Sequence, residues 1–93
     1  MAKREALESK MRARLQELRK DVEEIERRAE QTEINLELEY YTLLEELRLG
    51  LESTERKFEL LIESHDDQWE DIKAEFEEVW HAARELIRAV NSP

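Results

Sequence analysis

The sequence predicts an all-α protein, built as a helical hairpin or coiled coil within one domain over residues 1–93. Charged residues make up 43% of the chain, against about 25% in an average globular domain. The chain contains one Gly, one Pro and no Cys, whereas β-sandwiches and barrels need frequent Gly- and Pro-marked turns. Apolar residues recur at alternating steps of three and four, which is the spacing of one helix face.

The first helix is predicted over about residues 3–63. Its first apolar stripe keeps a heptad rhythm without a slip: Met11, Leu15, Leu18, Val22, Ile25, Ala29, Thr32 and Leu36. A repeated step of four, which locally unwinds a coiled coil without ending the helix, leads to the second stripe: Tyr40, Leu44, Leu47, Leu51, Thr54, Phe58 and Leu61. Gly50 lies beside this stripe, as a tolerated weak point or a kink. At 1.5 Å per residue, such a helix would be about 90 Å long.

A break at Gln31-Thr32 is the alternative. With Thr32 as the N-cap of a new helix, the chain would form a compact three-helix bundle. No Gly precedes Thr32 to mark the end of a helix, so the sequence favours the long helix.

A second, antiparallel helix is predicted over about residues 66–90. Ser64-His65-Asp66-Asp67 is the clearest break, because Ser and Asp side chains accept hydrogen bonds from the free N–H groups of a following helix. Arg84 and Arg88 lie near its C-terminal end, where cations are favoured. Trp80 and Ile87 broaden its apolar stripe, whose members are Trp69, Ile72, Phe76, Val79, Ala83, Leu86 and Val90.

The charges beside the first stripe predict an antiparallel homodimer centred near Glu23. In a parallel dimer, two of the three flanking charged pairs would be repulsive. In the antiparallel register each pair attracts, and an exposed pair is worth about 0.2–1 kcal/mol: Arg12–Glu33, Arg19–Glu26 and Asp21–Arg28. The predicted dimer interface combines these charges with the apolar residues Met11, Leu15, Leu18, Val22, Ile25, Ala29 and Leu36.

Two blocks of residues resemble a known group of proteins. Ala13-Arg14-Leu15-Gln16-Glu17-Leu18 and Trp69-Glu70-Asp71-Ile72-Lys73, the latter followed by Glu77 and Trp80, are similar to patterns of small uncharacterised bacterial coiled-coil proteins. In the chain Leu18 replaces a Trp common in that group, and Glu75 replaces a usual Gly. The resemblance implies a helical coiled-coil protein without known catalysis and supplies no catalytic residue.

Candidate chemistry is sparse. Glu78 and His81 form an E-x-x-H spacing used by di-iron bundles, but the stripe places both on the outer side of the helix, and no second copy exists. His65 falls in the predicted turn. The sequence contains no Gly-rich phosphate loop and no Ser-His-Asp arrangement. We therefore expect no enzyme activity, no cofactor and no metal site.

The net charge of −10 argues against nucleic-acid binding. Residues 1–31 carry nine basic and eight acidic groups, whereas residues 32–93 carry six and seventeen, so a basic protein partner would suit the C-terminal part. We expect no secretory signal, no integral membrane association and a cytoplasmic location. Two function classes remain. One is a structural or protein-interaction module, and the other is an amphipathic binder of lipid or granule surfaces, similar to apolipoproteins or phasins.

Overall fold

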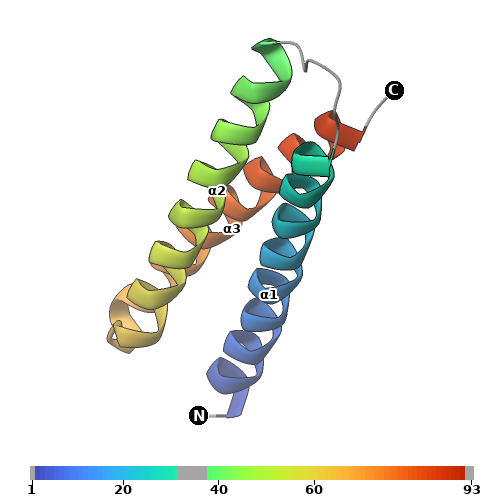
Figure 1. Ribbon diagram of the computed structural model, residues 1–93. Helices are drawn as coiled ribbons and strands as arrows, with labels where there is room; N and C mark the ends of the chain where they lie inside the picture. The colour runs from blue at the N-terminus through green and yellow to red at the C-terminus, as the bar shows by residue number, and fades with distance from the viewer. Residues whose placement is uncertain (1, 32–37, 92–93) are drawn as a thin grey trace.

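Three helices account for almost all of the residues that the structure describes. A computed structural model describes residues 2–31 and 38–91. Helix α1 spans Ala2–Gln31, α2 spans Leu38–Glu63 and α3 spans Asp66–Asn91 (Figure 1). The described ranges contain no strand. The predicted all-α class is therefore confirmed.

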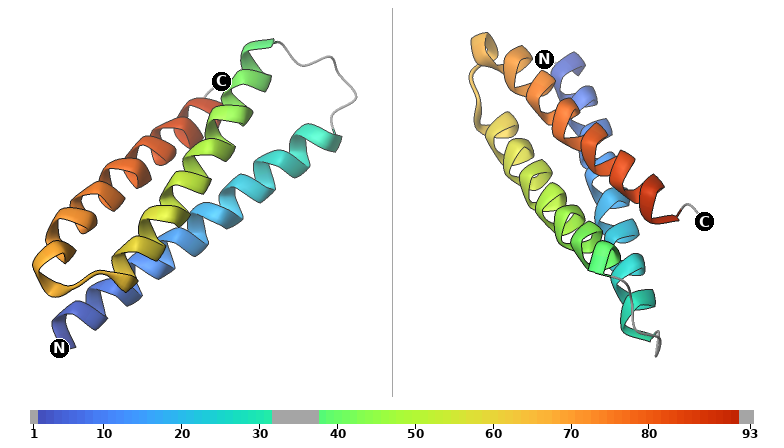
Figure 2. Two further views of the ribbon diagram at one scale, coloured as in Figure 1. Left: turned by 90° about the vertical axis from the view of Figure 1, so that its left-hand side faces the viewer. Right: turned by 90° about the horizontal axis from the view of Figure 1, so that it is seen from above.

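The helices pack compactly side by side. The molecule measures 51 × 20 × 17 Å along its principal axes. The chain rises in α1, descends in α2 and rises again in α3, so that the N-terminus lies at the same end as the α2–α3 turn (Figures 1 and 2). We call α2 and α3, with the turn that joins them, the hairpin.

The long helix predicted over residues 3–63 differs from this arrangement. Residues 2–31 and 38–63 lie in two helices that run in opposite directions, and Thr32 lies outside the described residues. The longest dimension of 51 Å is well short of the 90 Å expected of one helix. Two helices of opposite direction are favoured over one long helix because the stripes of α2 and α3 can then cover the stripe of α1 and bury its apolar side chains. The shorter helix predicted over 66–90 matches α3.

Local hydrogen bonds end α2 and begin α3. The backbone N–H of Ser64 donates to the carbonyl of Leu61 at 3.2 Å, and the Ser64 hydroxyl donates to the same carbonyl at 2.7 Å. The N–H of Gln68 donates to the carbonyl of His65 at 3.0 Å. Asp66 and Asp67 lie in the first turn of α3, where the helix dipole favours negative charge.

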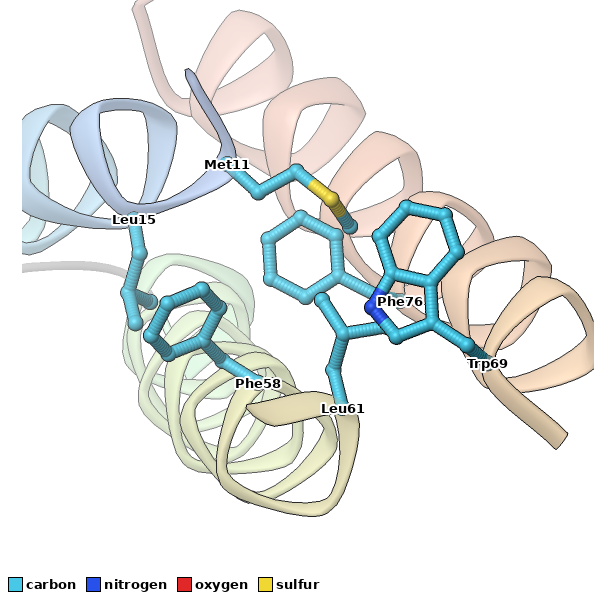
Figure 3. Close-up of a cluster of buried hydrophobic side chains, with 6 residues drawn as sticks. All are labelled: Met11, Leu15, Phe58, Leu61, Trp69 and Phe76. Atoms are coloured by element: carbon cyan, nitrogen blue, oxygen red, sulfur yellow. The ribbon is translucent and has the colours of Figure 1, made fainter. Parts of the chain in front are cut away.

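The core consists of two clusters along the bundle axis. The first, at the turn end, contains Met11, Leu15, Phe58, Leu61, Trp69 and Phe76. Figure 3 shows Leu15 of α1 against Phe58 of α2, with Met11 above the side chains of Leu61, Trp69 and Phe76. The second contains Leu18, Val22, Ile25, Leu47, Ala83 and Ile87. Each cluster draws on all three helices, so α1 is part of the core.

Gly50 and Thr54 shape the contact between α2 and α3. A Cβ atom on Gly50 would lie 3.4 Å from the Cβ of Ala83, so Gly50 is a close-packing position in a helix that carries no positive φ angle. Thr54 is fully buried, and its hydroxyl donates to the Gly50 carbonyl at 2.7 Å. The buried hydroxyl is thereby satisfied.

Candidate interaction surface

The apolar residues of the predicted dimer interface lie inside the chain's own core. Five of them are buried: Met11, Leu15, Leu18, Val22 and Ile25. Ala29 is half-buried and lies beside Tyr41 and Leu44 at the other end of the α1–α2 contact. Leu36 lies outside the described residues. The stripe of α1 is thus a helix-binding surface that is occupied by α2 and α3.

The charged residues of the predicted interface pair with the hairpin or stay within α1. Arg19 binds Glu55 at 2.6 Å, and Asp21 binds Arg84 at 2.8 Å. Three further residues complete the set: Glu26 binds Arg48 at 2.5 Å, Arg28 binds Glu24 of the same helix at 2.7 Å, and the Arg12 guanidinium lies 5.3 Å from the centre of the Phe58 ring. Glu33 lies outside the described residues. Ion pairs therefore flank the apolar stripe of α1 on the sides of both α2 and α3.

The hairpin residues predicted to form a core are buried or half-buried throughout. Leu47, Phe58, Leu61, Trp69, Phe76 and Ala83 are buried. Tyr40, Leu44, Leu51, Ile72, Val79, Trp80, Leu86 and Val90 are half-buried. Ile87, which we expected beside the stripe, is 6% exposed and belongs to the second cluster.

Arg4 joins the start of α1 to the turn of the hairpin. Its guanidinium donates to the carbonyls of Leu61 at 3.1 Å and Ser64 at 2.8 Å, and to a carboxylate oxygen of Asp66 at 2.6 Å. The last carbonyls of a helix have no partner within it and carry the negative end of its dipole. Arg4 therefore caps the C-terminal end of α2 from another helix.

Glu8 holds Arg4 in place and binds an indole at the same time. Its Oε2 atom accepts from Arg4 Nε and from Trp69 Nε1, each at 3.0 Å, and the Arg4 guanidinium lies 5.5 Å from the centre of the Trp69 ring. The hydrogen bond to Glu8 is the main cause that raises the pKa of Arg4 above its ordinary value. We call Arg4, Glu8, Asp66 and Trp69 the Arg4 latch.

Trp80 contacts two arginines, Arg14 of α1 and Arg84 of its own helix. The guanidinium groups of Arg14 and Arg84 lie 4.9 and 6.0 Å from its ring, and Arg84 also pairs with Asp21. The indole Nε1 of Trp80 is buried and has no hydrogen-bond partner among the described residues. The cation–π contact between Arg14 and Trp80 therefore joins α1 to α3.

The surface between α1 and α2 is hollowed into shallow grooves. One groove is lined by Arg12, Leu15, Gln16, Arg19, Glu55, Phe58 and Glu59. A second, further along, is lined by Glu26, Ala29, Glu30, Tyr41, Leu44, Glu45 and Arg48. Both grooves are lined by apolar and charged side chains of α1 and α2 together, which is the pattern of a helix-to-helix seam.

Sequence reasoning missed the residues that meet α1 from the hairpin. Arg48 and Glu55 each follow a stripe residue of α2 by one position, just as Arg19 and Glu26 follow stripe residues of α1. Applying the antiparallel pairing rule between the two stripes would have matched Arg19 with Glu55. Arg4 gave no such signal, since two of its partners are backbone carbonyls.

The remaining candidates for chemistry do not come together. Glu78 and His81 are exposed, and the ring of His81 lies against Trp80 at 4.9 Å. The described residues hold no group of three His, Asp or Glu side chains able to bind a metal. Within the described ranges, no helix is both long and apolar enough to cross a membrane.

Comparison with protein-family models, with curated proteins and with solved structures finds no match to this chain.

Proposed function

We propose that this protein is a non-enzymatic helical interaction module, whose single chain is a compact three-helix bundle and which assembles as an antiparallel homodimer. One observation carries the proposal: α1 is an amphipathic helix seated on the hairpin by a matched apolar seam with ion pairs along both edges. That combination is how helices recognise helices, because apolar burial supplies affinity and flanking charges set orientation.

The charge distribution supports recognition of one helix by the rest of the chain. Residues 2–31 carry nine basic and eight acidic groups, while residues 38–91 carry six and fifteen. The arginines of α1 meet acidic, carbonyl or aromatic groups of the hairpin, as Arg4, Arg14 and Arg19 show. The hairpin thus favours an amphipathic helix with arginines beside its apolar stripe.

Sedimentation of the whole chain over a concentration series tests the homodimer. We expect the mass to rise from 11.2 kDa to about twice that value as concentration increases. As a control, Arg27→Glu at an exposed position of α1 should leave this rise in mass unchanged. A mass of 11.2 kDa at every concentration would overturn the homodimer.

A second candidate is a binder of lipid or granule surfaces. Its support is that α2 exposes four large apolar side chains: Tyr41, Leu49, Leu60 and Ile62. Co-sedimentation with neutral and anionic phospholipid vesicles tests it. Wild type should bind, Leu49→Glu with Leu60→Glu should not, and Ala74→Glu on α3 should bind like wild type. Absence of wild-type binding to both vesicle types removes this candidate.

A further inference from the structure

We propose that the outer face of the hairpin, on the side away from α1, binds an amphipathic helix of another protein. That helix carries Lys or Arg side chains along both edges of its apolar stripe. The proposal rests on the interaction-module function proposed above but not on the homodimer, because it uses a surface that α1 leaves open.

Two exposed leucines of α2 mark this face. Leu49 is 52% exposed and Leu60 is 46% exposed. They are 11 residues apart, which is about three helical turns and about 16 Å, so both side chains point in nearly the same direction. Arg48 and Glu55 turn toward α1, and Lys57 turns toward α3. The two leucines, which we call the outer leucines, therefore occupy the remaining, open side of α2.

Small side chains lie beside the outer leucines. Ser53 stands between them on α2 and is half-buried. On α3, Ala82 is exposed and directly precedes Ala83, which packs against Gly50. A helix that lies along the outer leucines meets only short side chains at these positions, so its own apolar residues can reach the leucines.

Two rows of carboxylates flank the outer leucines. Each row has an acidic residue at every seventh position, a spacing that keeps side chains on one side of a helix. All six carboxylates are exposed, and Arg56 is the basic residue beside the α2 row, so this surface carries five negative charges in excess. The row on α2 is Glu45, Glu52 and Glu59, and the row on α3 is Asp71, Glu78 and Glu85.

Half of these carboxylates have no cation beside them. Glu59, Asp71 and Glu78 form no ion pair with another residue that the structure describes. Glu45 and Glu85 pair only with an arginine three residues further along the same helix. A partner with cations on both edges would therefore meet carboxylates that the chain itself leaves unpaired.

The two faces of the hairpin differ in the sign of their edges. Toward α1 the edge alternates, because Arg48 meets Glu26 and Glu55 meets Arg19. The outer face presents acids on both edges, and α1 with its mixed edges does not match it. Anionic membranes are repelled by the same charge. The outer face therefore fits a basic amphipathic helix better than a second copy of α1 or an anionic lipid surface.

Three labelled synthetic peptides test the chemistry of the partner. Each is a helix of about 21 residues, or three heptads. The first has a Leu stripe with Lys on both edges, the second has Ala in place of Leu, and the third has Glu in place of Lys. Each is titrated with the whole chain, and fluorescence anisotropy gives the Kd. We expect the second to bind at least about ten-fold more weakly than the first, and the third not to bind.

Substitution of the outer leucines tests the position of the site. Leu49→Ser with Leu60→Ser should weaken binding of the first peptide by at least about ten-fold. Tyr41→Ser with Ile62→Ser is the matched control, since it removes two other exposed apolar side chains of α2, and should change the Kd by less than about two-fold. Circular dichroism checks that both variants keep the helicity of the wild type.

Charge substitutions separate the two rows from the overall charge. Glu52→Lys with Glu78→Lys changes one carboxylate in each row and should weaken binding of the first peptide by at least about ten-fold. Glu17→Lys with Glu23→Lys, at exposed positions of α1, changes the total charge equally and should change the Kd by less than about two-fold. Arg56→Glu should tighten binding by at least about three-fold, because it removes the base beside the rows.

The outcomes separate this proposal from the others. No binding of the first peptide, or equal binding of the Leu and Ala peptides, would overturn the docking site. Equal losses for the row and α1 charge variants would trace the attraction to overall charge and also overturn it. Neutral vesicles that bind the wild type when the first peptide does not would assign the outer leucines to a lipid surface. Dimers in sedimentation without peptide binding would overturn the docking site alone, and failure of both would overturn the interaction module.

Discussion

Gly50 packs directly against Ala83, and a Cβ atom at Gly50 would lie 3.4 Å from the Cβ of Ala83. The side chain of Leu86 lies 4.0 Å from the same point. The close approach of α2 and α3 at this position therefore depends on residues with small side chains. Gly50, read from the sequence as a weak point or a kink, is a packing position in the hairpin.

Substitutions at Gly50 should separate helix propensity from packing. Gly50→Ala fits at ordinary contact distance and should stabilise the chain by up to about 1 kcal/mol, because Ala is the better helix former. Gly50→Leu should destabilise it by about 1–3 kcal/mol through overpacking. Urea unfolding followed by circular dichroism measures both. Ala74→Gly, at an exposed position of α3, calibrates propensity alone. Equal stability of the Ala and Leu variants would contradict the close packing.

The Arg4 latch should contribute to the stability of the turn end. Arg4→Ala removes hydrogen bonds to two carbonyls and two carboxylates, so we expect a melting temperature lower by several degrees. Arg4→Lys should recover only part of it, since an ammonium cannot reproduce the guanidinium fork. Lys10→Ala, at an exposed position of α1, is the matched control. If Arg4→Lys recovered the full melting temperature, the latch would depend only on the positive charge of Arg4 and not on the shape of its guanidinium group.

The two tryptophans should respond differently to the same change. Trp69→Phe removes an N–H that donates to Glu8 at 3.0 Å and should cost about 1–3 kcal/mol. Trp80→Phe removes a buried N–H with no partner among the described residues and should cost less than about 1 kcal/mol. Urea unfolding of the two variants beside wild type provides the comparison. A larger loss for Trp80→Phe would show that its contact with Arg14 and Arg84 outweighs the missing hydrogen bond.

Two leucines on α2 test the burial pattern directly. Leu47 is 0% exposed and Leu49 is 52% exposed, although they are only two residues apart. Leu47→Ala should cost about 2–5 kcal/mol, because it leaves a cavity in the second cluster. Leu49→Ala should change the free energy of unfolding by no more than about 0.5 kcal/mol. The measurement is a pair of urea unfolding curves, and similar losses at both positions would contradict the orientation of α2.

Much of the fold follows from the periodicity of the sequence. Every described member of the three stripes is buried or half-buried, and Asp66, proposed from its capping chemistry, begins α3. The direction of α2 relative to α1 could not be read in the same way. A stripe records which face of a helix is apolar but does not record which other stripe covers it.

The charged contacts were predicted with the right chemistry and different partners. Arg19 and Glu26 were expected to meet each other across a dimer, and in the chain they meet Glu55 and Arg48. Opposite charges beside antiparallel stripes can pair between two copies of one helix or between two helices of one chain. The charge pattern alone therefore does not distinguish these two arrangements. Arg4 was beyond such reasoning, because its carbonyl partners exist only once α2 has ended beside it.

The Arg4 latch also sets an order of events during synthesis. Arg4 precedes its partner Asp66 by 62 residues, and chains are made at about 5–20 residues per second. The first turn of α1 therefore leaves the ribosome about 3–12 seconds before the group that it binds. During that interval the apolar stripe of α1 has no hairpin of its own to cover it.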